Sequence, residues 1–275
     1  MNKAEFDVLA RLAERLPAAP AGSGELWIGD DAAVLAGGLL VTNDVLVHGL
    51  DWRDDWSSPA DVGWKSVMVN VSDIAAMGGR TDAILVGLVV ADGFDIDGFY
   101  DGVTEACAAA GCSVVGGDLS GGDQTVVSVT ALGRTDRAVT RSGARPGDGV
   151  FVSGRVGAAA RDLRNGGGPA HRRPTAYLGQ APGIVTAMID VSDGFVADCA
   201  HIAAASGLRI DLDAVPLADG ATVEDGLHGG DDYVLVATAG VAAIEGWVRV
   251  GACAAGVGVT WQGDPIEPHG WEHSL

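Results

Sequence analysis

The chain has 275 residues, of which 37 are acidic and 17 are basic, so its formal net charge at neutral pH is −20. Hydrophobic residues make up 48% of the sequence, which is enough for a packed core and excludes a disordered chain. The acidity, with only two lysines, Lys3 and Lys65, argues against nucleic acid or an anionic membrane surface as a partner. The length predicts one large or two modest domains.

The cysteines indicate neither a zinc knuckle nor a disulfide framework. None of the four belongs to a C-x-x-C pair, and each lies among small apolar residues, as buried thiols do. Residues 1–7 include acids and lack the apolar core of a signal peptide, and the longest apolar run, 83–91, is too short to span a membrane. We therefore expect a soluble, cytoplasmic protein.

A capped helix is the clearest element in the first half of the chain. Ser58 suits the N-cap, Pro59 suits the first turn and Gly78 suits the C-terminal end, so a helix is predicted from 59 to 77. Helix and strand signals alternate around it. The other elements predicted in this half are helices at 2–16 and 97–110 and strands at 25–28, 39–42, 83–90, 112–115 and 125–132.

A polar connector, RSGARPGD at 141–148, is the predicted boundary between two domains, 1–140 and 141–275. The Gly- and Pro-rich segment 165–183 is predicted to be a loop. The elements predicted in the second half are helices at 156–163 and 195–206 and strands at 149–152, 187–190, 208–212, 233–237 and 257–261. Strands that alternate with helices in this way indicate an α/β or α+β fold.

Aspartates recur at the ends of apolar strands. The pattern occurs at 27–31, 39–44, 113–118 and 187–193, with a related GGDD at 229–232. A single such aspartate is usually a cap or a turn former, but five cases in one chain suggest a shared role. Asp73 adds a carboxylate on the helix face that also carries Val62, Ser66 and Val69. Because unpaired buried carboxylates are costly, Mg²⁺ holding substrate phosphates is the predicted partner.

The common phosphate-binding motifs are absent from the sequence. There is no G-x-x-x-x-G-K-[ST], no G-x-G-x-x-G after a strand and no protein-kinase H-R-D. If the chain is a nucleotide enzyme, it is expected to bind phosphate through metal-bound aspartates and the amides of glycine turns.

Eight segments, in order along the chain, resemble thiamine-monophosphate kinase. They are GDDAAVL (29–35), TND (42–44), VNVSDIAAMGG (69–79), GGD (116–118), TRSGARPGD (140–148), IDVSDG (189–194), GGDDY (229–233) and GWEH (270–273). The resemblance implies the two-domain fold of the aminoimidazole ribonucleotide synthetase superfamily, with the N-terminal halves of a homodimer pairing into a β-barrel. It implies that domain 1–140 binds metal and ATP and dimerises. It also implies a kinase that converts ATP and thiamine monophosphate to ADP and thiamine diphosphate with several Mg²⁺ ions.

The same resemblance implies a set of site residues. The implied metal ligands are Asp31, Thr42, Asp44, Asp73, Asp118, Asp190 and Asp193. The implied ATP contacts are Gly117, Asp118, Arg141 and Ser192, and the implied acceptor contacts are Asp51, Asp231 and Trp271. Asp73 and Asp118 are expected to be the most critical residues.

Three positions depart from the family pattern. Asn43 stands where the family has threonine, and its side-chain oxygen is expected to join the metal ligands. Asp51 stands where the family has a substrate-side histidine, with His48 nearby, and Asp231 replaces a glutamate that is one methylene longer. The chain is also short in the regions 155–183 and 219–226.

No general base is expected, because the second pKa of a phosphate monoester is about 6 and the acceptor is already anionic at neutral pH. In-line transfer then depends on alignment and charge neutralisation. His171 and His228 fall in predicted loops, where exposure to solvent is expected, and His201 is expected to be structural. Two alternatives stay open: an ATP enzyme of the same superfamily with another acceptor, and a non-catalytic cation- or nucleotide-binding protein.

Overall fold

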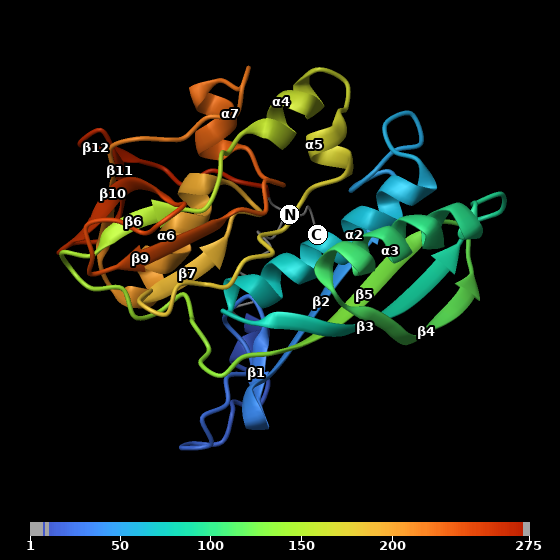
Figure 1. The fold of residues 1–275 in the computed structure, drawn as a ribbon, viewed down its shortest axis with the longest axis horizontal. Helices are drawn as coiled ribbons and strands as arrows, with labels where there is room; N and C mark the ends of the chain where they lie inside the picture. Colours follow the sequence, from blue (N-terminus) through green and yellow to red (C-terminus); the bar gives the residue numbers. More distant parts are fainter. Residues whose placement is uncertain (1–7, 9–10, 272–275) are drawn as a thin grey trace.

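Two β-sheets with helices packed on them make up the protein (Figure 1). The computed structural model describes residues 8 and 11–271. The first sheet spans residues 33–134 and the second spans 149–266, and the segment between them contains the predicted connector. Of the predicted helix at 2–16, residues 2–7, 9 and 10 lie outside the described residues, and residues 8 and 11–13 are helical. The mixed α/β class predicted from the sequence is confirmed.

The first sheet has five strands in the order β1-β2-β5-β3-β4. All neighbouring pairs are antiparallel except β3 with β4. The strands are β1 Ala33–Leu35, β2 Leu39–Val47, β3 Arg80–Val90, β4 Ser113–Gly121 and β5 Val126–Arg134, with a 3-10 turn, η1, at Ala36–Gly38. Two helices, α2 Pro59–Ala76 and α3 Ile96–Ala110, cover one face of this sheet (Figure 1).

Local sequence signals set the bounds of α2. Ser58 and Asp61 form a reciprocal capping box, with Pro59 in the first turn. Glycine is required where α2 crosses α3: a Cβ on Gly63 would lie 2.1 Å from the Phe99 carbonyl oxygen. The helix is buried along 14 of its 18 residues, so it is an interior element rather than a surface helix.

The second sheet has seven strands in the order β12-β11-β8-β10-β6-β9-β7. The strands are β6 Gly149–Val152, β7 Ala187–Asp190, β8 Arg209–Leu212, β9 Leu235–Ala239, β10 Val248–Ala254, β11 Gly258–Trp261 and β12 Asp264–Ile266. Helix α6, Phe195–Ser206, packs against β7, β8 and β11. Ala75 and Ala76 of α2 share a core cluster with Phe151, Met188 and Ala237 of this sheet. Helix α2 therefore packs against both sheets.

Three short helices lie at the upper edge of the molecule in Figure 1, near the boundary of the two sheets. They are α4 Ala158–Arg164, α5 Pro169–Arg172 and α7 Val223–His228. In the part of the chain that the structure describes, no helix is both long and apolar enough to cross a membrane.

Most predicted helices and strands are confirmed, but the prediction differs from the structure in several places. Strands β2 and β4 continue beyond their predicted ends at 42 and 115, so Asp44 and Asp118 lie within strands rather than after them. The extended segment 25–28 makes one bridge, from Leu26 to Val34, rather than a strand. Strand β9 begins at Leu235 because Tyr233 has a left-handed φ of 51°. Helix α5 lies inside the predicted loop 165–183; it is only four residues long and has no measurable periodicity. Strands β1, β10 and β12 and helix α7 were not predicted.

Candidate active site

Three buried carboxylates from distant parts of the sequence converge between the sheets. Asp31 precedes β1, Asp73 lies on α2 and Asp190 ends β7. One oxygen atom of each lies within 4.8 Å of the others. Burial, followed by the nearby charge of Asp31, raises the pKa of Asp190 to about 8. Burial and the charges of Asp44 and Asp190 also raise the pKa of Asp73 well above its ordinary value.

This cluster has the donor set of a hard-cation site. Thr42 Oγ1 donates to Asp73 at 2.6 Å, and Ser72 Oγ donates to Asp190 at 2.5 Å. Asp31 Oδ1 pairs with Arg141 Nη2 at 2.5 Å, but the buried Asp31 Oδ2 has no hydrogen-bond donor among the described residues. An unpaired buried carboxylate oxygen and an excess of negative charge fit Mg²⁺, which takes oxygen ligands.

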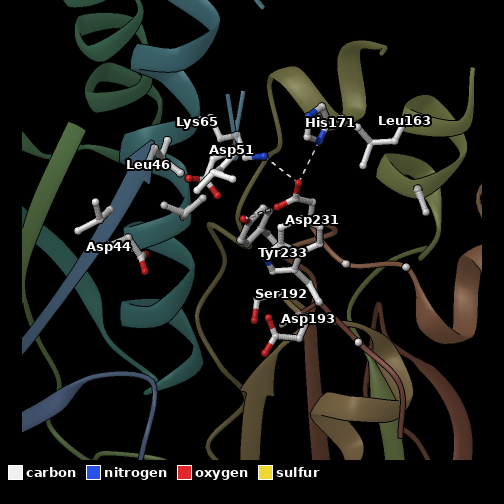
Figure 2. Close-up of a pocket in the computed structure, with 18 of the residues that line it drawn as sticks. Asp44, Leu46, Asp51, Lys65, Leu163, His171, Ser192, Asp193, Asp231 and Tyr233 are labelled. Carbon is white, nitrogen blue, oxygen red and sulfur yellow. Dashed lines mark hydrogen bonds and ion pairs between the residues drawn. The ribbon is translucent and has the colours of Figure 1, made fainter. Parts of the chain in front are cut away.

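A cavity of about 610 Å³ opens beside the cluster and is lined by residues of both halves of the chain. Asp73 of the cluster lines it, together with six of the other predicted site residues. Those six are Asp44, Asp51, Ser192, Asp193, Asp231 and Trp271. Burial and the charges of Asp51, Asp193 and Asp31 raise the pKa of Asp44 to about 6. Figure 2 shows Asp44 of β2 on one side of this cavity and Asp193, from the loop after β7, on the other.

Asp231, the predicted acceptor contact, lies in the same cavity at the centre of a polar network. Its Oδ2 accepts from Lys65 Nζ at 2.7 Å and lies 2.9 Å from His171 Nδ1, while its Oδ1 accepts from the Tyr233 hydroxyl at 2.7 Å. Burial by itself would raise the pKa of Asp231, but the Lys65 ammonium and these hydrogen bonds hold that pKa below its ordinary value. The carboxylate is therefore ionised at neutral pH.

Gly117 and Asp118 do not join the cluster within one chain. They lie on the edge strand β4. Gly117 lies opposite Val86 of β3, Val86 lies opposite Val129 of β5, and Val129 lies opposite Asp44 of β2. Three strand spacings correspond to roughly 14 Å. Every residue of β4 is exposed.

The Asn43 side chain also lies apart from the cluster, which differs from the prediction that its oxygen joins the metal ligands. Successive residues of β2 point to opposite faces, so Thr42 faces α2 while Asn43 faces the open side of the sheet. There its amide donates to Ser128 Oγ, the Val129 carbonyl and Thr130 Oγ1.

Arg141 lies beside the cluster, and the acids next to it are its partners in this structure. Its guanidinium pairs with Asp31, and its backbone N–H donates to Asp30 at 3.1 Å. Its Nε is buried with no hydrogen-bond acceptor among the described residues, and lies 3.8 Å from Asp30 Oδ1. An anionic ligand that enters here therefore has an unsatisfied donor available.

The sequence prediction missed two cavity residues, Lys65 and His171. Lys65 received no role, although Lys65, Val69 and Asp73 follow one another at intervals of four, which places them on one helix face. The expectation that His171 is solvated was wrong, because it is buried against Asp231 and packs edge-on to Trp56. No local pattern in the segment 165–183 indicated that contact.

A second group of potential ligands lies around the start of α6. Ligand atoms of Asp193, Asp198 and His201 lie within 4.8 Å of one another. The Gly194 N–H donates to Asp198 at 3.1 Å. Burial, helped by the charge of Arg141, lowers the pKa of His201 to about 4, so this imidazole is neutral at neutral pH.

Comparisons with known proteins identify the family of this chain. Residues 29–135 match the family described as AIR synthase related protein, N-terminal domain. The chain is 35% identical to thiamine-monophosphate kinase from Aquifex aeolicus, covering 90% of this chain and 92% of that protein. It is 39% identical to thiamine-monophosphate kinase from Mycobacterium tuberculosis, covering 90% of this chain and 84% of that protein.

Solved structures give the same result. The chain superimposes with a TM-score of 0.87 and 34% identity on a structure described as AaThiL complexed with AMPPCP and TMP, covering 98% and 97% of the two chains. A hydrogenase maturation protein in complex with ATP, at 20% identity and a TM-score of 0.64, shares the fold, covering 80% and 78% of the two chains. The extent and identity of these matches show that the chain belongs to the thiamine-monophosphate kinase family.

Proposed function

We propose that the protein transfers the γ-phosphoryl group of ATP to thiamine monophosphate, giving ADP and thiamine diphosphate. The observation that carries this proposal is one cavity that joins a buried carboxylate cluster to a polar network around Asp231. The match to a chain described as complexed with AMPPCP and TMP supports it.

The reaction is a direct in-line transfer in this proposal. An oxygen of the acceptor phosphate forms a bond to the γ-phosphorus as the bond from that phosphorus to the β,γ-bridging oxygen breaks. The acceptor oxygen is already anionic near neutral pH, so no side chain needs to remove a proton. The protein then acts by aligning the two phosphates and neutralising their charge.

The residues around the cavity fit distinct roles. Mg²⁺, when bound, supplies the positive charge that allows two phosphates to approach. Its proposed ligands are Asp31, Thr42, Asp44, Asp73, Asp190 and Asp193. Arg141 and Ser192 are the proposed ATP contacts, and Asp51 and Trp271 join Asp231 as acceptor contacts.

A homodimer is the second part of the proposal. The face of the first sheet opposite α2 exposes Val45 and Leu85, and the edge strand β4 exposes Val115 and Leu119. An apolar surface beside an unpaired edge strand favours association with another chain. We propose that two copies pair through this surface into the β-barrel implied by the family. In that arrangement, Asp118 of the partner subunit approaches the open face of β2, on which Asn43 lies.

The activity is tested by incubating purified protein with ATP, Mg²⁺ and thiamine monophosphate and by measuring thiamine diphosphate and ADP. We expect the two products in equal amounts, and we expect neither in excess EDTA. Turnover with another phosphorylated acceptor alone would overturn the choice of acceptor. ATP binding without turnover of any acceptor would overturn the catalytic proposal.

A further inference from the structure

The network around Asp231 ties together three segments that are distant in sequence. Lys65 comes from α2, His171 from α5, and Asp231 from the loop before β9. The Lys65 and His171 side chains are each 6% exposed, whereas the Asp231 side chain is 25% exposed and lines the cavity. The Lys65 and His171 side chains are therefore enclosed, and the carboxylate is the member of the network that a ligand can reach.

The hydrogen bonds leave one acceptor position on this carboxylate. Each carboxylate oxygen offers about two lone-pair sites. Lys65 and His171 both occupy Asp231 Oδ2, whereas Tyr233 alone occupies Oδ1. A single hydrogen bond from a ligand to Oδ1 would fill the last acceptor position of the Asp231 carboxylate.

The position of the network determines which part of the acceptor meets it. Figure 2 shows Lys65, His171 and the Asp231 carboxylate together, apart from Ser192 and Asp193. The phosphates are expected at the aspartate-rich end of the cavity, where a metal compensates their charge. The heterocyclic part of the acceptor is then the part that reaches Asp231.

The charge of the network favours a neutral donor over a full cation. Lys65 already compensates the negative charge of Asp231 at 2.7 Å. The paired Asp231 carboxylate therefore offers the ligand a directional hydrogen-bond acceptor rather than a net negative charge. The exocyclic amine of an aminopyrimidine ring is a donor of this kind.

A role in stability alone does not explain the ion pair between Lys65 and Asp231. A buried ion pair can often be replaced by packed apolar side chains without loss of stability, because desolvation offsets its attraction. Asp231 and Tyr233 also adopt left-handed φ values of 63° and 51°, which non-glycine residues hold only where the surroundings impose them. These features are characteristic of a group held in place for a ligand.

We propose that Lys65 is a positioning residue that, with His171, orients Asp231 to accept a hydrogen bond from the exocyclic amine of the acceptor's pyrimidine ring. This inference rests on the proposed function and deepens it. It assigns Lys65 and His171 to recognition of the acceptor and gives Asp231 a specific partner group.

The test compares variants of Lys65 with a matched control. For Lys65→Met we expect the KM for thiamine monophosphate to rise at least tenfold, with kcat within threefold and the KM for ATP unchanged. Lys65→Arg keeps the donor and should recover most of the loss. The control is Arg173→Met: Arg173 also ties the α5 region to the first domain, through Glu105 and Asp61, but lies outside the cavity. Its KM for thiamine monophosphate should stay within twofold.

A second substrate distinguishes the loss of a specific hydrogen bond to the exocyclic amine from a general loss of acceptor binding. Oxythiamine monophosphate has a carbonyl in place of the exocyclic amine. The wild type should prefer thiamine monophosphate at least tenfold in kcat/KM, and Lys65→Met should reduce that preference to about threefold or less. Equal use of the two acceptors by the wild type, or undiminished preference in Lys65→Met, would overturn the proposal.

Two further measurements keep the result interpretable. If Lys65→Met does not fold, the double variant Lys65→Met/Asp231→Asn leaves no unpaired buried charge and should show the same loss of preference. Calorimetric binding of each acceptor in the presence of a non-hydrolysable ATP analogue does not depend on turnover. A wild type that binds thiamine monophosphate selectively without phosphorylating it would refute the proposed function alone, and one that does not bind it would refute both.

Discussion

Replacing Asp73 by asparagine should have opposite effects on stability and on metal response. Asp73 lies with Asp31 and Asp190 in a cluster whose oxygen atoms are within 4.8 Å of one another. Asparagine removes a negative charge and has nearly the same shape. Its side-chain oxygen can still accept the hydrogen bond from Thr42. The substitution therefore changes charge without opening a hole in the core.

The size of the effect follows from the geometry. Two unit charges 4.8 Å apart repel by about 3 kcal/mol at an effective dielectric constant of 20. In the wild type, proton uptake by the cluster relieves most of this repulsion, as the raised pKa of Asp190 reflects. We therefore expect the substitution to raise the free energy of unfolding of the metal-free protein by about 1–2 kcal/mol. At roughly 2–4 °C per kcal/mol for a protein near this size, the metal-free variant should melt about 2–8 °C higher than the wild type.

Differential scanning calorimetry in EDTA and in Mg²⁺ measures both effects. Mg²⁺ should raise the Tm of the wild type and leave that of Asp73→Asn nearly unchanged, and the variant should lose kinase activity. Asp92→Asn, at an exposed position, is the control and should behave as the wild type in both buffers. If Asp73→Asn melts lower in EDTA and keeps the full response to Mg²⁺, the carboxylates do not form a metal site.

Two further predictions concern pH and assembly. The folded-state pKa of Asp190, about 8, exceeds its unfolded value. The contribution of protonated Asp190 to the free energy of unfolding is therefore complete below about pH 4 and is lost as the pH rises through 8. The Tm in EDTA should therefore fall between pH 5 and 8, and the gain from Mg²⁺ should grow over that range; a gain that is independent of pH would contradict this. Val115→Asp, at a side chain 61% exposed on β4, should convert a dimer into a monomer of 27.8 kDa by light scattering. Val257→Asp, at an 84% exposed valine in the second half of the chain, should leave the mass unchanged, and a dimer that survives Val115→Asp would place the interface elsewhere.

The convergence of Asp31, Asp73 and Asp190 was accessible from sequence because each lies at a position that local periodicity identifies. Asp31 precedes a strand, Asp190 ends one, and Asp73 lies on the buried face of a well-capped helix. The alternation of side chains along a strand also predicts that Asn43 and Thr42 lie on opposite faces of the sheet. The prediction for Asn43 applied a family pattern without regard to the strand, and within one chain the Asn43 amide bonds to β5 instead of the cluster.

The network around Asp231 was not accessible in the same way. Lys65 and Asp231 are 166 positions apart, and the contact between them depends on how two sheets pack on one helix. His171 lies on a four-residue helix within a Gly- and Pro-rich segment, where neither periodicity nor capping identifies its neighbours. Contacts of this kind depend on tertiary packing, and hydrophobic patterning does not determine them.

Helix α2 carries both Lys65 and Asp73, and this has a consequence for the length of acceptor that the cavity accepts. Eight residues of α-helix span about 12 Å, and the spacing is fixed by backbone hydrogen bonds rather than by the contact between the two halves of the chain. Movement of one sheet relative to the other would change the width of the cavity but would leave the interval between Lys65 and Asp73 the same. In the proposed binding mode, the helix thus acts as a rigid spacer between the phosphate end and the ring end of the acceptor. Acceptors whose phosphate and amine are held closer together or farther apart should bind at one end or the other, but not at both.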